Sequence, residues 1–160
     1  MKTLIACYSY SGHTLKVAEA LKEEIDADLT VIKTVKDKWY VFKLWDAIRE
    51  KKVPIEPCVT DLIDFDGLVV CCPVWGGKVP AAVNQYLSEL KNLKGKHFGV
   101  FVTYGGSRSQ KATVQMRDYL DGEGMLFLGQ MRLLSKDVDE GNYGEVFDFF
   151  VKKFNFNKVI

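Results

Sequence analysis

Residues 3–25 read TLIACYSYSGHTLKVAEALKEEI, and three patterns follow one another along this stretch. Residues 3–8 are largely apolar, as in a central strand of a parallel sheet that is buried on both faces. From Thr14 onward, apolar residues recur at the helical period, with charged residues mostly on the opposite side. Between the two patterns lies a short loop of hydroxyl-bearing residues around Gly12. The stretch therefore predicts a strand, a loop and an amphipathic helix, which together make the first unit of an α/β fold.

Strand and helix patterns alternate along the rest of the chain. We expect further strands at 29–35, 67–72, 96–103 and 125–134, and helices at 36–53, 79–93, 110–120 and 143–154. Five strands alternating with helices predict a doubly wound parallel sheet with helices on both faces. Because crossover connections are right-handed, the expected strand order is 2-1-3-4-5. A chain of 160 residues has room for one well-buried core, so we expect a single domain over residues 1–160.

Composition and charge exclude several classes of function. The chain has 22 Lys and Arg against 21 Asp and Glu, and the basic residues are scattered, so we expect no nucleic-acid partner. No stretch approaches the roughly 20 apolar residues that cross a bilayer, so we expect no membrane insertion. The apolar run at residues 4–7 is too short for the core of a signal peptide. These features predict a cytoplasmic protein.

The four cysteines do not form a recognisable metal or redox motif. They are Cys7, Cys58, Cys71 and Cys72, with no C-x-x-C pair and no histidine at metal-ligand spacing. Adjacent residues of a strand point to opposite faces, so Cys71 and Cys72 are interpreted as two small buried hydrophobic residues. We therefore expect neither a metal centre nor a dithiol redox centre.

Three polar or glycine-bearing loops each follow a predicted buried strand. They are Ser9-Tyr10-Ser11-Gly12-His13-Thr14, Pro73-Val74-Trp75-Gly76-Gly77-Lys78 and Thr103-Tyr104-Gly105-Gly106-Ser107. In an open parallel sheet, ligands bind beyond the carboxyl ends of the strands. The three loops can therefore converge on one ligand.

The first two loops suggest what that ligand contains. Hydroxyl groups and backbone amides at the start of a helix can hold a phosphate. The first loop has neither the G-x-x-x-x-G-K-S/T pattern of nucleoside-triphosphate loops nor the G-x-G-x-x-G pattern of dinucleotide-binding loops. Their absence favours a monophosphate. In the second loop, Trp75 offers a flat face to a conjugated ring, and Gly76 and Gly77 permit unusual backbone conformations. Taken singly, each loop has a plainer interpretation: a polar turn with a serine cap, and a core-anchoring Trp followed by a flexible turn.

Together the three loops resemble those of short-chain flavodoxins, the FMN-binding domains of the flavodoxin-like family, and the resemblance covers essentially the whole chain. The family's phosphate loop, S/T-x-S/T-G-x-T, is matched by residues 9–14. The resemblance implies an FMN cofactor whose phosphate is held by Ser9, Ser11, Gly12, His13 and Thr14. It also implies that Trp75 packs on the isoalloxazine ring, that the Gly76 peptide lies near flavin N5, and that residues 103–107 contact the pyrimidine end.

The resemblance implies electron transfer through FMN to partner proteins, and two alternatives stay open. Flavodoxins that carry electrons are typically acidic around the flavin, whereas this chain has a net charge of +1 and places Lys78 and Arg108 near the predicted rim. Tyr104 either covers the second flavin face or completes the fourth strand. An open face and a positive rim would suit an FMN-dependent oxidoreductase that uses NAD(P)H and a quinone. The other alternative is a flavin-free interaction module on the same fold.

The basic and aromatic segment 36–52 also allows two interpretations. Its aromatic residues, Trp39, Tyr40, Phe42 and Trp45, stand among lysines. They either pack an amphipathic helix onto the core or help to dock an acidic redox partner.

Overall fold

The computed structural model describes residues 1–35, 52–106 and 108–155. The elements are β1 (Thr3–Cys7), α1 (His13–Ile25), β2 (Asp28–Val31), β3 (Gly67–Pro73), α3 (Ala81–Glu89), β4 (His97–Tyr104), α4 (Ser109–Gly122), β5 (Leu126–Leu134), α5 (Ser135–Glu140) and α6 (Gly144–Asn155). Nearly all of the helix expected at 36–53, with its aromatic residues, lies outside the described residues, as does the predicted site residue Ser107.

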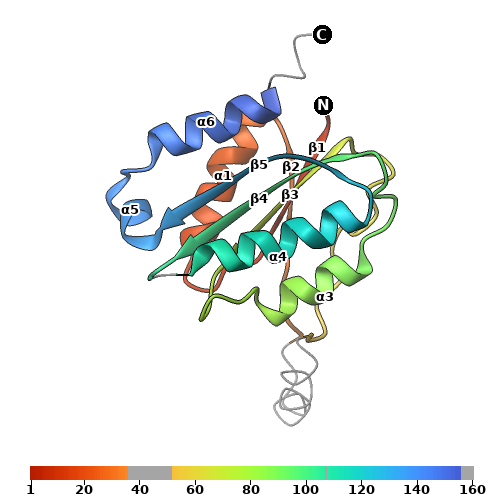
Figure 1. The fold of residues 1–160 in the computed structure, drawn as a ribbon, viewed down its shortest axis with the longest axis horizontal. Helices are drawn as coiled ribbons and strands as arrows, with labels where there is room; N and C mark the ends of the chain where they lie inside the picture. Colours follow the sequence, from red (N-terminus) through yellow and green to blue (C-terminus); the bar gives the residue numbers. More distant parts are fainter. Residues whose placement is uncertain (36–51, 107, 156–160) are drawn as a thin grey trace.

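The described strands form one parallel sheet in the order β2-β1-β3-β4-β5. This order confirms the predicted topology. Helices α1 and α6 cover one face of the sheet, and α3 and α4 cover the other (Figure 1). All of these strands run parallel, so the loops that follow β1, β3 and β4 lie at the same edge of the sheet.

Most predicted boundaries lie within two residues of the observed ones, and two element ends differ by four residues. The second strand ends at Val31 instead of residue 35; beyond it the chain leaves the ladder, and Thr34 forms an isolated antiparallel bridge with Ile55. The helix expected at 79–93 begins at Ala81, because Pro80 is extended at ψ 144°, and it ends at Glu89. The short helix α5 was not predicted.

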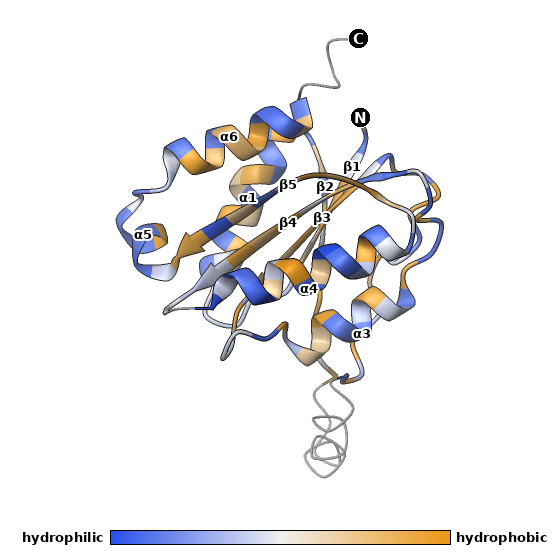
Figure 2. Ribbon diagram, in the orientation of Figure 1, coloured by the Kyte–Doolittle hydropathy of each residue, from blue (hydrophilic) through white to orange (hydrophobic). Residues whose placement is uncertain are grey.

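The sheet separates two hydrophobic clusters, and residues of β1 alternate between them. Leu4 and Ala6 belong to the cluster under α3 and α4, whereas Ile5 and Cys7 belong to the cluster under α1 and α6. The strands and the inner faces of the helices are accordingly the most hydrophobic parts of the ribbon (Figure 2). This arrangement fixes the sheet, and with it the edge that carries the loops, between two packed layers.

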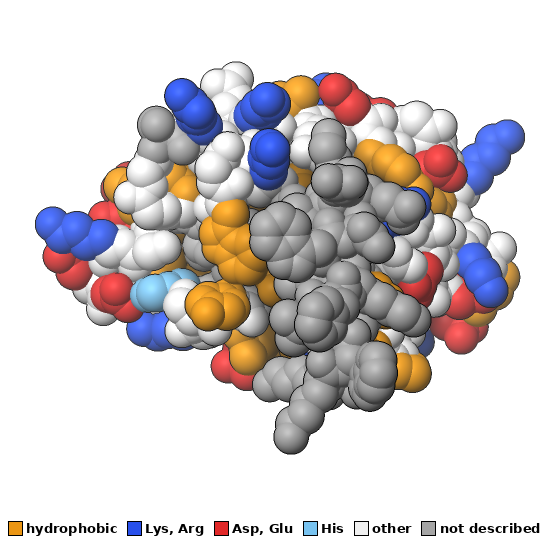
Figure 3. All heavy atoms as spheres, turned by 90° about the horizontal axis from the view of Figure 1, so that it is seen from below, with side chains coloured by type: hydrophobic (Ala, Val, Ile, Leu, Met, Phe, Trp, Pro, Cys, Tyr) orange, Lys and Arg blue, Asp and Glu red, His pale blue; other side chains and the backbone are white. Residues whose placement is uncertain are grey.

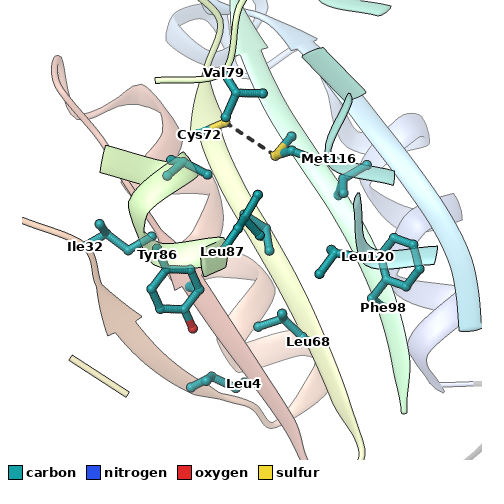
Figure 4. Packing of buried hydrophobic residues seen from close by; sticks show 14 of the residues in the cluster. Leu4, Ile32, Leu68, Cys72, Val79, Tyr86, Leu87, Phe98, Met116 and Leu120 are labelled. Carbon is teal, nitrogen blue, oxygen red and sulfur yellow. Dashed lines mark hydrogen bonds between the residues drawn. The ribbon is translucent and has the colours of Figure 1, made fainter. Parts of the chain in front are cut away.

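The structure confirms the interpretation of Cys71 and Cys72 as buried hydrophobic residues. Both are completely buried, and they lie in opposite clusters. The thiol of Cys72 contacts the sulfur of Met116 at 3.9 Å in the cluster under α3 and α4 (Figure 4). On the other face, burial raises the pKa of Cys7 to about 12, so this thiol is protonated at neutral pH.

Gly99 of β4 is needed for packing against the last helix. A Cβ atom at this position would lie 2.7 Å from Cζ of Phe154 and 3.0 Å from Cζ of Phe150. Both rings are almost fully buried, so they have little room to move. The missing side chain therefore lets α6 lie close against the sheet.

Among the described residues, no helix is long and apolar enough to cross a membrane. In the same part of the chain, no group of three or more His, Cys, Asp or Glu side chains is placed to hold a metal ion.

Candidate functional site

Backbone hydrogen bonds bring the three predicted loops side by side at the carboxyl edge of the sheet. The N–H of Tyr8, just after β1, donates to the carbonyl of Cys71 in β3 at 2.9 Å. The N–H of Val74, just after β3, donates to the carbonyl of Thr103 in β4, also at 2.9 Å. The ladder thus continues past the strand ends, and the described parts of all three loops meet at one place.

The first loop is organised around the side chain of Ser9. Its Oγ accepts hydrogen bonds from the N–H of Gly12 at 3.2 Å and from the N–H of Leu15 at 3.3 Å. Gly12 has φ +93°, a left-handed conformation that other residues rarely adopt, and α1 starts at the next residue. The first N–H groups of a helix lack intrahelical acceptors and carry partial positive charge. This loop therefore presents a helix start that favours an anion.

His13 connects the first loop to the helix that was not predicted. Its Nδ1 lies 2.5 Å from Oγ of Ser11, and its Nε2 lies 3.0 Å from Oδ1 of Asp139 in α5. The side chains of His13 and Asp139 are 27% and 67% exposed. Ser11, His13 and Asp139 form a continuous chain of hydrogen bonds that borders the helix start.

A buried hydroxyl pair connects the first loop to the third. Thr14 Oγ1 lies 2.7 Å from Thr103 Oγ1, and the two residues are only 1% and 2% exposed. Thr14 is in the first turn of α1, and Thr103 is near the end of β4. The pair therefore holds the helix start against the sheet.

The second loop is a tight turn that requires both of its glycines. Trp75 and Lys78 exchange two backbone hydrogen bonds, at 3.2 and 3.0 Å. Gly76 and Gly77 between them have φ +58° and φ +78°, as in a type I′ turn. A Cβ atom on Gly77 would lie 3.1 Å from Cβ of Arg108. The turn thus packs against the segment that leads into α4.

Trp75 is the centre of an aromatic cluster beside the first loop. The rings of Tyr8 and Tyr10 lie nearly perpendicular to its ring, at 81° and 86°, with ring centroids 5.9 and 5.7 Å away. Trp75 is 47% exposed and Tyr10 is 82% exposed. Exposed hydrophobic side chains gather at the middle of the face shown in Figure 3, beside Lys and Arg side chains. A partly exposed indole held between two tyrosines offers a surface for a flat aromatic ligand.

The third loop begins inside β4. Tyr104 is the last residue of that strand and is half-buried, and its carbonyl accepts a hydrogen bond from Oγ of Ser135 at 3.4 Å. Tyr104 therefore completes the strand, which was one of its two predicted roles. Gly105 and Gly106 follow it and are exposed. Arg108, with φ +75°, precedes α4 and is exposed, so a positive charge lies beside the second loop.

The remaining predicted residues also lie at this edge, and two further residues were missed. Pro73 and Val74 are half-buried, and Lys78 is exposed. The missed residues are Tyr8, which packs against Trp75, and Asp139, which binds His13. Tyr8 directly precedes the first loop, so its position in the sequence could have suggested it. No signal near Asp139 indicates its partner 126 residues earlier.

Comparison with solved structures shows what the chain is similar to. A flavoprotein in complex with FMN from Lactobacillus acidophilus NCFM shares 27% identity, with a TM-score of 0.67 over 87% of this chain and 97% of that one. Oxidised flavodoxin 2 from Bacillus cereus shares 22% identity, with a TM-score of 0.68 over 98% and 99% of the two chains. The apo form of the NADH:FMN oxidoreductase EMOB shares 16% identity, with a TM-score of 0.65 over 98% and 88%.

The structural similarities confirm the flavodoxin-like fold. No curated protein matches the sequence. A family model described as NADPH-dependent FMN reductase, however, matches residues 1–139. Because this match spans most of the sequence, the chain belongs to the NADPH-dependent FMN reductase family.

Proposed function

We propose that this protein binds FMN at the carboxyl edge of its sheet and acts in electron transfer. The main support for this proposal is that two features suited to FMN lie next to each other at this edge. The anion-favouring start of α1 lies next to the partly exposed ring of Trp75, which Tyr10 of the first loop contacts directly. FMN has a phosphate and a flat conjugated ring, so one ligand would satisfy both features. Membership of the FMN reductase family supports the same cofactor.

The first loop would hold the phosphate. Its helix start supplies N–H groups and partial positive charge, and Ser11 supplies an exposed hydroxyl. Ser9 keeps the loop in shape, because its Oγ is already occupied by two backbone N–H groups. Thr14 lies beneath the loop and anchors it to Thr103.

The second and third loops would hold the ring. Trp75 provides a stacking surface, and the turn at Gly76 and Gly77 brings backbone amides beside it. Lys78 of the second loop and Arg108, which follows the third loop, are both exposed. Their positive charges would favour a negatively charged reduced ring and so raise its reduction potential. When bound, FMN itself supplies the redox chemistry, and the protein supplies position and electrostatics.

A second candidate is an FMN-dependent oxidoreductase that takes electrons from NAD(P)H and passes them to a quinone-type acceptor. The family description names NADPH, and the positive side chains of Lys78 and Arg108 are placed to attract a phosphorylated nucleotide. The two candidates differ in partner, a redox protein in one and small molecules in the other. For both, composition supports action in the cytoplasm.

The first experiment titrates the purified protein with FMN and follows the visible spectrum and flavin fluorescence. Trp75→Ala should weaken FMN binding by about 2- to 13-fold, the range that one aromatic contact supplies. Phe149→Ala is the matched control, because Phe149 is an exposed aromatic residue on α6, and it should leave the affinity unchanged. A protein that does not change the flavin signal would contradict FMN binding and favour a flavin-free interaction module.

Stepwise anaerobic reduction then separates the two functions. Stable one-electron-reduced flavin would favour a carrier. Direct two-electron reduction by NADPH, followed by reoxidation with a quinone, would favour the oxidoreductase.

A further inference from the structure

The hydrogen-bond chain of Ser11, His13 and Asp139 has a consequence for anion binding. Ser11 Oγ lies 2.5 Å from Nδ1 of His13, and Nε2 lies 3.0 Å from Oδ1 of Asp139. Both nitrogens of the imidazole are thus occupied, one by a hydroxyl at the helix start and one by a carboxylate on α5. The protonation of the ring therefore determines the direction of both hydrogen bonds.

The carboxylate fixes one of these directions. An ionised carboxylate only accepts hydrogen bonds, so Nε2 of His13 must carry a proton and donate it to Asp139. In a neutral imidazole the other nitrogen, Nδ1, then has no proton. The hydroxyl of Ser11 must donate to it. In this state, Ser11 has only lone pairs to offer to a ligand.

A phosphate group would need Ser11 to donate a hydrogen bond, because the phosphate oxygens are acceptors too. If the contact between Ser11 and His13 is kept while Ser11 donates its hydroxyl proton to a phosphate oxygen, Nδ1 of His13 carries a proton of its own and donates to Ser11 Oγ. We propose that binding of the FMN phosphate takes up one proton from solvent at Nδ1 of His13, with Asp139 positioning the resulting imidazolium. This inference rests on the proposed function, since it concerns the phosphate of the FMN that this site would bind.

The charges around His13 agree with this assignment. Residues 9–14 contain no Lys or Arg, so the imidazolium would be the only full positive side-chain charge within the first loop. Lys16 of α1 reaches toward α5, where its Nζ lies 3.5 Å from the carbonyl of Val138.

On α5, Nζ of Lys136 lies 3.7 Å from Oε1 of Glu140. Glu140 is thus paired with a lysine, whereas Asp139 is paired with His13. Asp137 is half-buried on the same helix, and Tyr10 within the first loop packs against Trp75. Protonation of His13 therefore adds positive charge at the helix start while keeping the Asp139 contact.

Calorimetric titration in buffers of different ionisation enthalpy tests the proposal directly. At pH 8, each FMN bound should take up between about 0.5 and 1 proton. The Kd for FMN should rise by up to about tenfold per pH unit above neutrality. Riboflavin has the same ring without the phosphate, so its binding should take up no proton and should depend little on pH.

Variants test the role of each residue. Asp139→Asn keeps a hydrogen-bonding side chain but removes the charge that holds the imidazolium, so proton uptake with FMN should fall by at least about half. Glu140→Gln is the control, because it removes a neighbouring carboxylate from the same helix, and it should leave proton uptake unchanged. His13→Asn should abolish proton uptake while riboflavin binds as before, which shows that the site remains folded.

The outcomes separate this inference from the proposed function. If neither FMN nor riboflavin binds, the proposed function fails and the inference fails with it. If FMN binds without proton uptake, or with the same uptake as riboflavin, the proposed function stands and the inference is wrong. Full proton uptake in Asp139→Asn would overturn the role of Asp139.

Discussion

Replacing Thr14 or Thr103 with valine tests the buried hydroxyl pair between the first and third loops. The two oxygens are 2.7 Å apart, and the residues are 1% and 2% exposed, so the hydroxyl left behind by either single change cannot turn to bulk water. Leaving a buried polar group without a partner costs about 1–3 kcal/mol. We therefore expect each single variant to lose that much free energy of unfolding.

The double variant gives the sharper result. Thr14→Val combined with Thr103→Val removes both hydroxyls and leaves two methyl groups of similar shape, so it should cost only about 0–1 kcal/mol. The sum of the two single costs should then exceed the double cost by at least about 1 kcal/mol, which is above the scatter of about 0.5 kcal/mol for additive pairs. Urea unfolding of all four proteins in the presence and absence of FMN measures these values.

A matched control uses Thr113, which is also fully buried but donates to the backbone carbonyl of Gln110 in its own helix. Thr113→Val should be additive with Thr14→Val to within about 0.5 kcal/mol. If the two loop threonines are as additive as this control pair, their hydroxyls are not coupled in the folded protein.

Two other predictions concern packing and thiol reactivity. Gly99→Ala should lower the free energy of unfolding by about 1–3 kcal/mol, because its Cβ atom would lie 2.7 Å from the buried ring of Phe154; chemical denaturation measures this, and an unchanged midpoint would show that α6 can shift. Cys58 is half-buried whereas the other three cysteines are fully buried, so iodoacetamide should label one thiol in the native protein and four in denaturant. Burial raises the pKa of Cys58 above that of an ordinary thiol, which lowers its thiolate fraction at neutral pH, so the labelling rate should keep rising above pH 9; native labelling of more than one thiol would contradict the observed burial.

The main features of the fold could be predicted from the sequence because periodicity carries them. Runs such as 67–72 are apolar at every position, which is the pattern of a strand buried on both faces. With alternating helices, this pattern predicts the strand order through the handedness of crossovers. The end of β2 was harder to predict, because the β-branched residues continue after the chain has left the ladder at Val31.

The candidate site could be predicted in part. Its three loops follow buried strands, and topology alone places them at one edge. Helix α5 was missed because only Val138 is buried among its six residues, so it shows no periodic apolar stripe. With α5 missed, the contact between Asp139 and His13 could not be foreseen, since it depends on three-dimensional packing across most of the chain.

These contacts determine when the first loop can reach its final form as the chain is synthesised. The first loop is made before the residues that support it. Thr14 pairs with a residue 89 positions further on, and His13 pairs with one 126 positions further on. At about 5–20 residues per second, the second partner follows His13 by about 6–25 seconds. Even β1 needs β3, whose first residue is 64 positions after its partner Thr3. The loop at the centre of the candidate site is therefore made well before its supports, and it can reach its final form only after they have been made.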